Sequence, residues 1–510
     1  MNRPESWTRW IAIVLLVAVF GIASFARAME DGLNHDEHQF LAPAVLLARH
    51  GLLPYQDYPV FHLPALTLIY AGLTHCTSYL LFATKGFSIF CSTLTAGLVA
   101  WVCCRKTQTD SREPGILCAA LLLCVLLFDP LYDFTTGKIW NHEFPALCLV
   151  VALICIGEAA RGRAQMPLSL IAGAAVGAAI GARLTFAPIA LPLGCAFLFF
   201  AVPWPRRVRL AGVFGAGVLI LLLPAFWLWL RAPEHFVFDN LQFPRLRLLD
   251  PTDVRVQRTM SWWRKLRFFV KEIAGLSWPL FLAYLLIGIA PAVQWFRNRS
   301  DRLFPAALIL ATLPFLFVGC GAPSRYQYQH FFAFIPVLAL GVAYGLQTRV
   351  HEWMRYATAL LAFSVAGSLV MTGITSAKET RKWIVGLARP EGWLPVRVHE
   401  EATIIRSHVA AGKVLTMGPI LPLEAGLDIY PEFATGPFAW RAASLVEPAR
   451  RRRLHFIAPE DLGELLAHDP PAAVLTGFEK DPLELPLIEY AKQQNLRPIP
   501  LARARVLWVR

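Results

Sequence analysis

The 510-residue sequence is poor in charged residues. Asp, Glu, Lys and Arg make up only 16% of it, where a soluble protein of this length carries about 25%. Hydrophobic residues make up 56%, and many fall in runs of roughly 18 or more, the length that crosses a bilayer. These features exclude an ordinary soluble fold and predict a multi-spanning α-helical membrane protein.

Cysteine is absent from the polar C-terminal region, since the last of the ten cysteines is Cys320. Most of the others lie inside apolar runs, where Cys behaves as a small hydrophobe, and none are spaced as CxxC. We therefore expect no disulfide framework and no cysteine metal site. The formal net charge of +13 does not indicate a nucleic-acid partner, because much of it sits in short loops, where Lys and Arg set membrane topology.

Eleven apolar runs are long enough to be membrane spans. They lie at 10–28, 87–103, 115–132, 144–160, 166–182, 184–202, 209–230, 274–295, 303–320, 329–346 and 356–374. If a twelfth candidate, 62–82, does not cross and the N-terminus is inside, every short inside loop is basic, as the positive-inside rule requires. We therefore expect 62–82 to form a helix on the outer surface, interrupted near Pro59 and Pro64. Run 10–28 is interpreted as an uncleaved anchor and not as a signal peptide.

Two domains follow from this pattern. Residues 1–374 form the transmembrane domain, with a first outer segment at 29–86 and a long outer loop at 231–273. Residues 375–510 contain an amphipathic helix near 398–411 and strands in KVLTMG, PAAVLTGF and ARVLWVR, which is typical of a small α/β domain. Span parity places this domain outside; in a Gram-negative inner membrane the N-terminus is then cytoplasmic and the domain periplasmic. The basic run 450–453 predicts a solvated face or, alternatively, contact with anionic lipid headgroups.

Unusual polar residues gather in the outer segments. The residues singled out as a candidate site are His35, Asp36, Glu37, Tyr55, His62, Lys138, His142, Glu143, Arg183, Arg245 and Arg325. Ionisable groups at membrane level are costly, so such a gathering on one side indicates function.

The adjacent pair Asp36 and Glu37 begins a helical pattern, QFLAPAVLLARHG. Two adjacent carboxylates allow one to act as a general base while the other orients it or caps the helix. A plain helix cap explains the pair equally well, but a second acidic site on the same side favours function. That site, KIWNHEFPAL, places Lys138, His142 and Glu143 just before a span.

Three further interpretations of these residues stay open. Glu143 also suits the first turn of a helix that begins near Pro145. The histidines and carboxylates of the two acidic segments would suit a divalent metal, although their spacing is not diagnostic. Arg183 and Arg325 suit phosphate if they face one cavity, whereas a lone Arg183 also suits a snorkelling anchor. Arg245, in the long outer loop, would cover such a site or touch lipid headgroups.

Three stretches carry a family resemblance: HDEHQFLAPAVLLARHGLLPYQDYPVFHLPALTLIY, WNHEFPAL and SRYQYQHFFAFIPVLALGVAYG. With the topology, they resemble the GT-C superfamily of polytopic glycosyltransferases, over roughly residues 10–374, and most closely the aminoarabinose transferase and protein O-mannosyltransferase group. The resemblance implies that Asp36 is the catalytic base, Glu37 its partner and Glu143 a second acidic residue. It also implies that His62 and Arg325 lie near a donor phosphate. Glu143 stands where the family usually has Asp, and His62 stands where the aminoarabinose branch has Lys, so that branch is not singled out.

The implied reaction is an inverting transfer from a polyprenyl-phosphate sugar to a lipid, polysaccharide or protein acceptor. Asp36 would deprotonate the acceptor hydroxyl, and cations such as Arg325 would stabilise the leaving phosphate. No cofactor is required, although a divalent metal is compatible with the residues. The alternative is a transporter or flippase of lipid-linked or anionic solutes. A transporter predicts inverted repeats and polar residues at mid-membrane; the sequence has no clear repeat, and its polar residues gather at one face.

Overall fold

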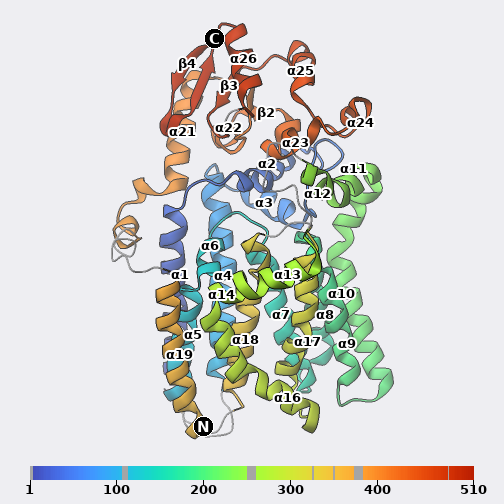
Figure 1. Ribbon diagram of the computed structural model, residues 1–510, viewed down its shortest axis with the longest axis vertical. Coiled ribbons are helices and arrows are strands. Elements are labelled where there is room, and N and C mark those ends of the chain that lie inside the picture. The colour runs from blue at the N-terminus through green and yellow to red at the C-terminus, as the bar shows by residue number, and fades with distance from the viewer. Residues whose placement is uncertain are drawn as a thin grey trace.

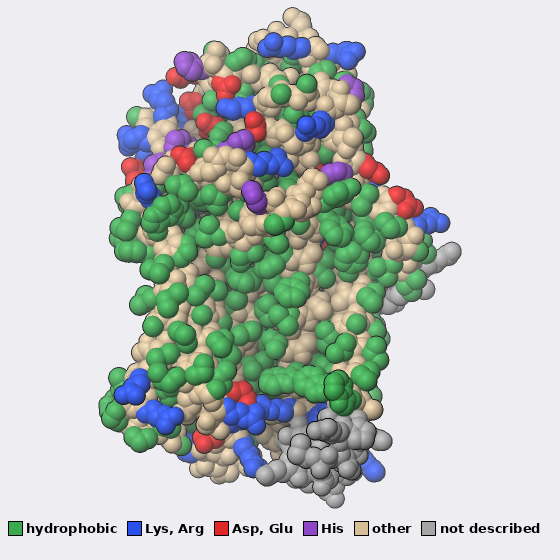
Figure 2. Space-filling model, turned by 180° about the vertical axis from the view of Figure 1, so that it is seen from behind, with side chains coloured by type: hydrophobic (Ala, Val, Ile, Leu, Met, Phe, Trp, Pro, Cys, Tyr) green, Lys and Arg blue, Asp and Glu red, His purple; other side chains and the backbone are tan. Residues whose placement is uncertain are grey.

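The computed structural model describes residues 4–105, 113–249, 260–323, 327–348, 351–372, 383–479 and 482–510. It is an elongated bundle of long helices with a smaller domain stacked on one end (Figure 1). On the face shown in Figure 2, a broad band of hydrophobic side chains covers the middle of the molecule, with charged side chains gathered toward both ends. This distribution is that of a multi-pass membrane protein.

Nine helical segments in the described residues are long and apolar enough to cross a membrane. They are Trp7–Glu30 (in α1, Pro4–Glu30), Leu80–Cys104 (α4), Glu143–Ala160 (α7), Gln165–Ala182 (α8), Trp204–Arg231 (α10), Trp278–Asn298 (α15, Trp278–Ala283; η6, Tyr284–Gly288; α16, Ile289–Asn298), Phe304–Gly321 (α17), Tyr328–Leu346 (η7, Tyr328–Phe331; α18, Phe334–Leu346) and Trp353–Met371 (in α19, His351–Met371).

The other two predicted spans, 115–132 and 184–202, are shorter apolar helices than expected. The first is α5 (Glu113–Leu127), which ends before Asp129 and Pro130 because Asp129 caps the next helix, α6 (Pro130–Thr135). The second is divided into η1 (Leu184–Ile189), α9 (Ala190–Cys195) and η2 (Ala196–Phe199). Proline lacks the N–H that an α-helical turn needs, so Pro188, inside η1, explains its tighter turns.

The orientation-deciding segment 62–82 is not a span. Its helix, α3 (Ala65–His75), has eleven residues and is followed by a break before α4 begins at Leu80. It packs on α2 (His35–His50), next to the outer domain (Figure 1). The prediction that 62–82 does not span the membrane is therefore confirmed.

Glycines let α8 and α10 approach each other closely. A Cβ on Gly173 would lie 1.9 Å from the backbone oxygen of Phe214, and one on Gly217 would lie 2.5 Å from that of Leu170. Any side chain there would separate the two helices, so the small residues of this region serve packing, as their spacing predicts.

Short helices cover the end of the bundle that faces the smaller domain. Besides α2, α3 and α6 they are α11 (Pro233–Val237), η3 (Phe238–Gln242), α12 (Phe243–Leu246), η4 (Arg247–Leu249), α13 (Trp262–Phe268), η5 (Phe269–Ile273) and α14 (Ala274–Leu276).

The C-terminal domain is built on a five-stranded sheet of order β2-β1-β3-β5-β4. Strands β1 (Lys413–Thr416), β2 (Asp428–Ile429) and β3 (Ala473–Thr476) are parallel, whereas β5 (Val506–Val509) runs antiparallel to β3 and to β4 (Arg497–Pro500). Strands β1, β3 and β5 and helix α21 lie where the sequence predicts them. Strand β4 was missed because it contains two prolines, which only an edge strand tolerates.

Helices surround this sheet and connect its strands. They are η8 (Pro390–Gly392), α21 (Leu394–His408), α22 (Ile420–Glu424), η9 (Pro431–Phe433), α23 (Pro437–Ala443), α24 (Pro448–Arg453), η10 (Pro459–Asp461), α25 (Leu462–His468), α26 (Leu485–Gln493) and η11 (Ala502–Ala504).

The basic run 450–453 is not simply a solvated face. Arg451 is buried, and its guanidinium bonds Glu460 at 2.8 Å and Asp461 at 2.6 Å. Arg450 reaches across to the outer loop, where it donates a hydrogen bond to Gln242 Oε1 at 2.8 Å. Of the four arginines, Arg451 is therefore a buried structural residue, and Arg450 makes a contact at the surface.

Candidate active site

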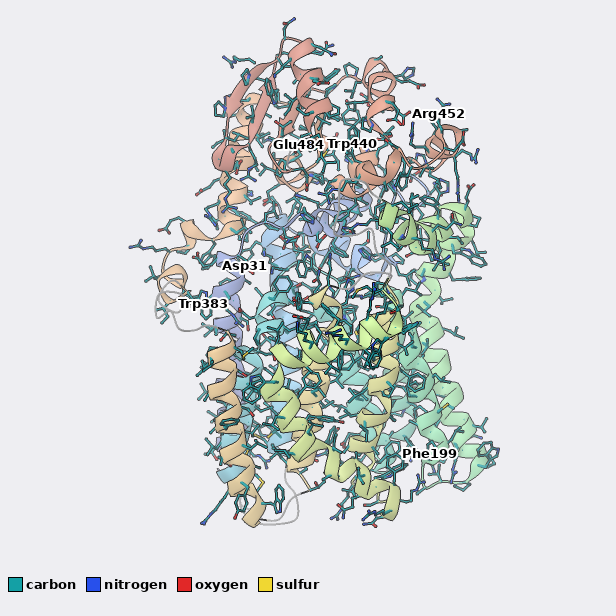
Figure 3. All side chains as sticks on the ribbon, in the orientation of Figure 1. Asp31, Phe199, Trp383, Trp440, Arg452 and Glu484 are labelled. Carbon is teal, nitrogen blue, oxygen red and sulfur yellow. The ribbon has the colours of Figure 1, made fainter. Side chains whose placement is uncertain are left out.

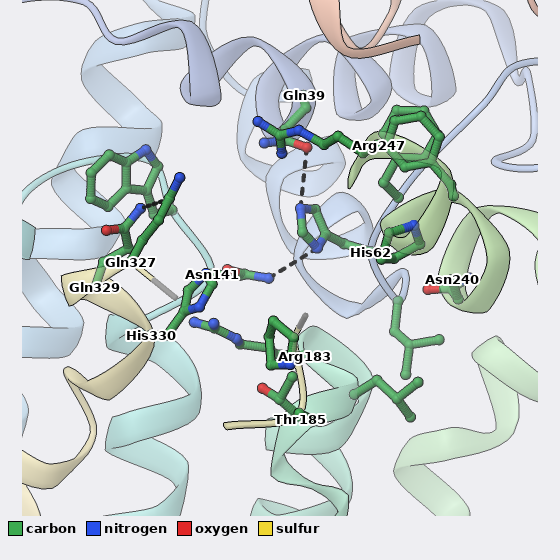
Figure 4. Close-up of a pocket in the computed structure, with 18 of the residues that line it drawn as sticks. Gln39, His62, Asn141, Arg183, Thr185, Asn240, Arg247, Gln327, Gln329 and His330 are labelled. Carbon is green, nitrogen blue, oxygen red and sulfur yellow. Dashed lines mark hydrogen bonds between the residues drawn. The ribbon is translucent and has the colours of Figure 1, made fainter. Parts of the chain in front are cut away.

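A cavity of about 630 Å³ lies where the outer helix ends meet the C-terminal domain. Its walls come from α2, the segment before α3, the segment after α6, the α8–η1 junction, residues 240–248, the end of α17 and the start of η7. Phe438 of the C-terminal domain also lines it. Figure 4 draws 18 of its lining residues and labels ten of them. The charged and polar side chains that line it are Asp36, Gln39, His62, Asn141, His142, Arg183, Thr185, Asn240, Arg245, Arg247, Gln327, Gln329 and His330.

Asp36 lies at the start of α2, in a complete capping box. Asn34 Oδ1 accepts from the Asp36 backbone N–H at 2.9 Å, and Glu37 Oε2 accepts from the Asn34 N–H at 2.8 Å. The cap thus uses the side chains of Asn34 and Glu37. The Asp36 carboxylate is left over to line the cavity, with 22% of its side chain exposed.

Glu37 points the other way, into the protein. Its carboxylate is fully buried, lies 3.3 Å from Lys85 Nζ and accepts the Ile139 backbone N–H at 3.0 Å. Lys85 also donates to the Gly137 carbonyl at 3.1 Å. Glu37 therefore joins the first outer segment to the second and does not line the cavity.

Glu143 has a comparable place on the second segment. It is buried at the first turn of α7, and its Oε1 accepts the Gly137 N–H at 3.0 Å. Gly137 has φ +83°, and a Cβ there would lie 2.2 Å from that of Ala28, so only glycine fits. The predicted acids thus divide into one that faces the cavity, Asp36, and two that build its wall.

His62 is held between two amides. Asn141 Nδ2 lies 3.3 Å from its Nδ1, and its Nε2 lies 3.2 Å from Gln39 Oε1 (Figure 4). Since Nδ2 donates and Oε1 accepts, this pairing fixes a neutral ring protonated at Nε2. Burial, with Arg183 and Arg247 nearby, lowers the pKa of His62 to about 3. The ring stacks on Phe40 at 4.7 Å and offers the cavity no charge.

Arg183 projects from the α8–η1 junction and donates from Nη1 to Nδ1 of His142. Burial lowers its pKa to about 10, so it stays charged at neutral pH. Burial and then Arg183 lower the pKa of His142 well below its ordinary value. In the described part of the chain no carboxylate pairs with Arg183, so a buried cation faces the cavity with a neutral partner.

Arg245 and Arg247 bring two further cations to the cavity from the long outer loop. The Arg247 guanidinium lies 4.5 Å from the ring centre of Phe438, which ties this loop to the C-terminal domain. Against three arginines, the described lining offers one carboxylate, Asp36. Planar guanidinium groups bind phosphate through paired hydrogen bonds, so the cavity suits a phosphorylated ligand next to a single base.

Five of the predicted site residues that the structure describes do not line the cavity. Tyr55 is buried, and its hydroxyl donates to the His62 carbonyl at 2.5 Å. Lys138 bonds the Phe134 carbonyl, and its ammonium lies over the rings of Phe134 and Trp140. The remaining three are His35, Glu37 and Glu143. Arg325 falls outside the described residues.

Sequence reasoning missed the amides and the third histidine of the site. Gln39, Asn240, Gln327 and Gln329 carry uncharged amides, and His330 stands at the start of an apolar run, so none of them looks unusual in the sequence. QYQH nevertheless belongs to a stretch already singled out. Phe438 gave no sequence indication, because only folding brings the C-terminal domain over the cavity.

The chemistry of the site does not fit a divalent cation. In the described residues no three His, Cys, Asp or Glu side chains come close enough to hold a metal ion. His142, one of the histidines considered as a metal ligand, already accepts from the Arg183 guanidinium, which would repel a cation. No step of the reaction is therefore assigned to a metal.

The structure is similar to that of ArnT from Cupriavidus metallidurans. It matches the apo form with a TM-score of 0.58 and 16% identity over 99% of this chain and 98% of that one. The form bound to undecaprenyl phosphate matches with a TM-score of 0.57 and 17% identity, over 98% of this chain and 97% of that one. The chain has the GT-C fold.

A second GT-C protein is also similar. It is the Archaeoglobus fulgidus oligosaccharyltransferase tethered with an acceptor peptide, with a TM-score of 0.50 and 13% identity over 99% of this chain and 74% of that one. No protein-family model matches the sequence, and no curated protein matches it.

Proposed function

We propose that this GT-C protein is an inverting glycosyltransferase that moves a sugar from a polyprenyl-phosphate donor to a lipid, glycan or protein acceptor. The observation that carries the proposal is the cavity itself, which is lined by one carboxylate, Asp36, and by a buried arginine, Arg183, that has no carboxylate partner among the described residues. The similarity to ArnT bound to undecaprenyl phosphate supports the lipid-phosphate part.

In this mechanism Asp36 takes the proton of an acceptor hydroxyl. The freed oxygen attacks the anomeric carbon from the side opposite to the phosphate, and the C–O bond to the phosphate breaks with inversion. Negative charge then grows on the lipid phosphate. Arg183, Arg245 and Arg247 are placed to stabilise that charge in a water-poor cavity, where such interactions are strongest.

The neutral histidines fit this role. A guanidinium that pairs with a carboxylate has its charge cancelled, whereas one that donates to a neutral imidazole keeps it. His142 therefore orients Arg183 without competing with phosphate, and the amides around His62 offer donors and acceptors suited to sugar hydroxyls.

The elements that line the cavity, such as α2 and α12, lie toward the end of the molecule that carries the C-terminal domain (Figure 1). The opposite end holds the arginines of the short loops, Arg105, Arg161 and Arg163, around Glu158. By the positive-inside rule we assign that end to the cytoplasm and the cavity to the outer, periplasmic side.

The test is to purify the protein in detergent and identify bound lipid by mass spectrometry, and then to follow the consumption of polyprenyl-phosphate sugars in vesicles with acceptor present. We expect a bound polyprenyl phosphate and a released lipid phosphate for each sugar transferred. Movement of the intact donor across the vesicle membrane without cleavage would contradict the proposal and favour a flippase.

A further inference from the structure

His35 lies between two carboxylates that come from different domains. Its Nε2 is 3.5 Å from Asp36 Oδ1, and its Nδ1 is 4.0 Å from Glu479 Oε1. The ring also meets the ring of Phe438 edge to face at 5.7 Å. His35 does not line the cavity, and 45% of its side chain is exposed. It therefore connects the cavity carboxylate with solvent.

Glu479 is held firmly at this place. Its other oxygen, Oε2, accepts from Arg441 on α23, which leaves Oε1 facing His35. The turn that carries it is fixed by Glu484, whose carboxylate accepts the backbone N–H groups of Gly477 and Phe478. Glu484 and Trp440 lie inside the C-terminal domain (Figure 3). Only 8% of the Glu479 side chain is exposed.

The rest of the surroundings add little competing charge. On α2, His38 is buried, and burial together with His35 lowers its pKa to about 3, so it stays neutral. Arg505 approaches Phe478 from the C-terminal domain, but it is paired with Glu401 at 2.6 Å. Arg247 lies over the Phe438 ring that His35 contacts. The groups that act on His35 most directly are thus the two carboxylates.

The proposed transfer leaves one proton on Asp36 for each sugar moved, and that proton must depart before the next cycle. We propose that His35 carries this proton from Asp36 to solvent, and that Glu479 of the C-terminal domain holds His35 in the tautomer able to receive it. This inference rests on the proposed function. Glu479 is accordingly a positioning residue and His35 a relay.

The chemistry balances in three steps. A carboxylate near Nδ1 favours the proton on that nitrogen, which leaves the Nε2 lone pair facing Asp36. After attack, the acceptor O–H bond is broken and its proton is on Asp36; it passes to Nε2 and leaves Asp36 ionised. The imidazolium, stabilised by Glu479, then releases one proton to water, and the lipid phosphate retains the electron pair of the broken C–O bond.

The first experiment does not depend on turnover. The full-length protein is labelled with ¹⁵N in its histidine rings, placed in nanodiscs, and compared with H35Q, which identifies the His35 signals. We expect the neutral form of the wild-type ring to carry its proton on Nδ1, and a shift toward the Nε2 tautomer in E479Q. A neutral wild-type ring protonated at Nε2 would overturn the relay.

The second experiment measures transfer against pH for H35Q, E479Q and the double variant, with the exposed Glu489→Gln of the same domain as a matched control. For H35Q we expect kcat to fall on the order of tenfold, with KM for the donor unchanged. E479Q should have a smaller effect and a shifted pH profile. The double variant should equal H35Q alone, because Glu479 acts through His35.

Thermal midpoints of all variants show whether they fold. Folded single variants with wild-type kcat and pH profile, or effects that multiply in the double variant, would overturn the relay. A protein that shows the tautomer shift and transfers no sugar from any polyprenyl phosphate would overturn the proposed function, and the relay with it, while the pairing of Glu479 with His35 would stand.

Discussion

The two ends of the transmembrane bundle bring together the same kinds of charge and use them differently. At the end away from the C-terminal domain, Glu158 bonds Arg105, Arg161 and Arg163, the last two at 2.8 and 3.1 Å. At the other end, the described cavity lining also has three arginines and one carboxylate, but Arg183 donates to neutral His142. In the first cluster each arginine has a carboxylate partner, whereas in the second Arg183 keeps its charge for a ligand.

The two clusters differ in the partners of their arginines and in how deeply those arginines are buried. A carboxylate that bonds three guanidinium groups near water needs nothing further. A buried guanidinium is costly unless its hydrogen bonds are made and its charge is met by a counter-ion. The protein makes one such bond through His142 and leaves the charge itself to be met from the cavity. The predictions below test this contrast, from the largest expected effect to the smallest.

Replacing the carboxylate of each cluster should give the largest difference in effect between the two ends. Asp36→Asn keeps the shape of the side chain but cannot accept the proton, so we expect kcat to fall by about 10²–10⁴-fold. Glu158→Gln should lower thermal stability and leave kcat close to wild type. Turnover in vesicles measures both; a near-wild-type D36N enzyme would remove Asp36 from the mechanism.

Lys85→Met should test whether Glu37 has a structural role in the wall of the cavity. It leaves the fully buried Glu37 carboxylate without its ammonium, which costs about 3–5 kcal/mol in comparable pairs. Arg163→Gln, which removes an exposed partner of Glu158, should cost less than about 1 kcal/mol. Thermal unfolding in detergent measures both. Adding Glu37→Gln to Lys85→Met should restore part of the loss, and no restoration would show that charge is not the cause.

Arg183→Gln and Arg161→Gln compare one arginine from each end. Losing a charged hydrogen bond to phosphate at Arg183 should raise KM for the donor about 10- to 100-fold. Arg161→Gln should leave KM unchanged, since Arg161 pairs with Glu158. Equal effects on KM would contradict the assignment of the phosphate to the cavity.

The smallest effect should be a change in the pH dependence of stability. His62 has a pKa of about 3 when folded and about 6.5 when unfolded. Between these values the unfolded state binds more protons, so His62 makes stability fall as pH drops from about 7 toward 4. His62→Gln should therefore give a shallower loss of thermal midpoint over this range. The exposed His408→Gln is the control and should keep the wild-type slope.

The sequence predicted the positions of the helices better than it predicted their lengths. Hydrophobic runs located every membrane-length helix, because lipid requires long apolar segments wherever the chain crosses. They overestimated 115–132 and 184–202, where Asp129 and Pro188 end or tighten the helix within an apolar run. Loop charge identified 62–82 correctly, because it used information from outside the segment.

The candidate site divides in the same way. Of the residues singled out in the sequence, Asp36, His62, His142, Arg183 and Arg245 line the cavity. Glu37 and Glu143 resembled Asp36 in sequence, but whether a carboxylate faces ligand or protein depends on partners far along the chain. Lys85 lies inside an apolar run, and nothing local indicates that it bonds Glu37 and Gly137.

Sequence by itself determined that the chain crosses the membrane repeatedly, with its acidic and histidine-rich segments at one end, because hydrophobic length and loop charge act locally. Tertiary structure alone decided which acid faces the cavity, which arginine lacks a carboxylate partner, and that Glu479 lies beside His35. The reason is that the role of a charged side chain depends on its neighbours within a few ångströms. Here those neighbours come from segments as far apart in the sequence as residues 35 and 479.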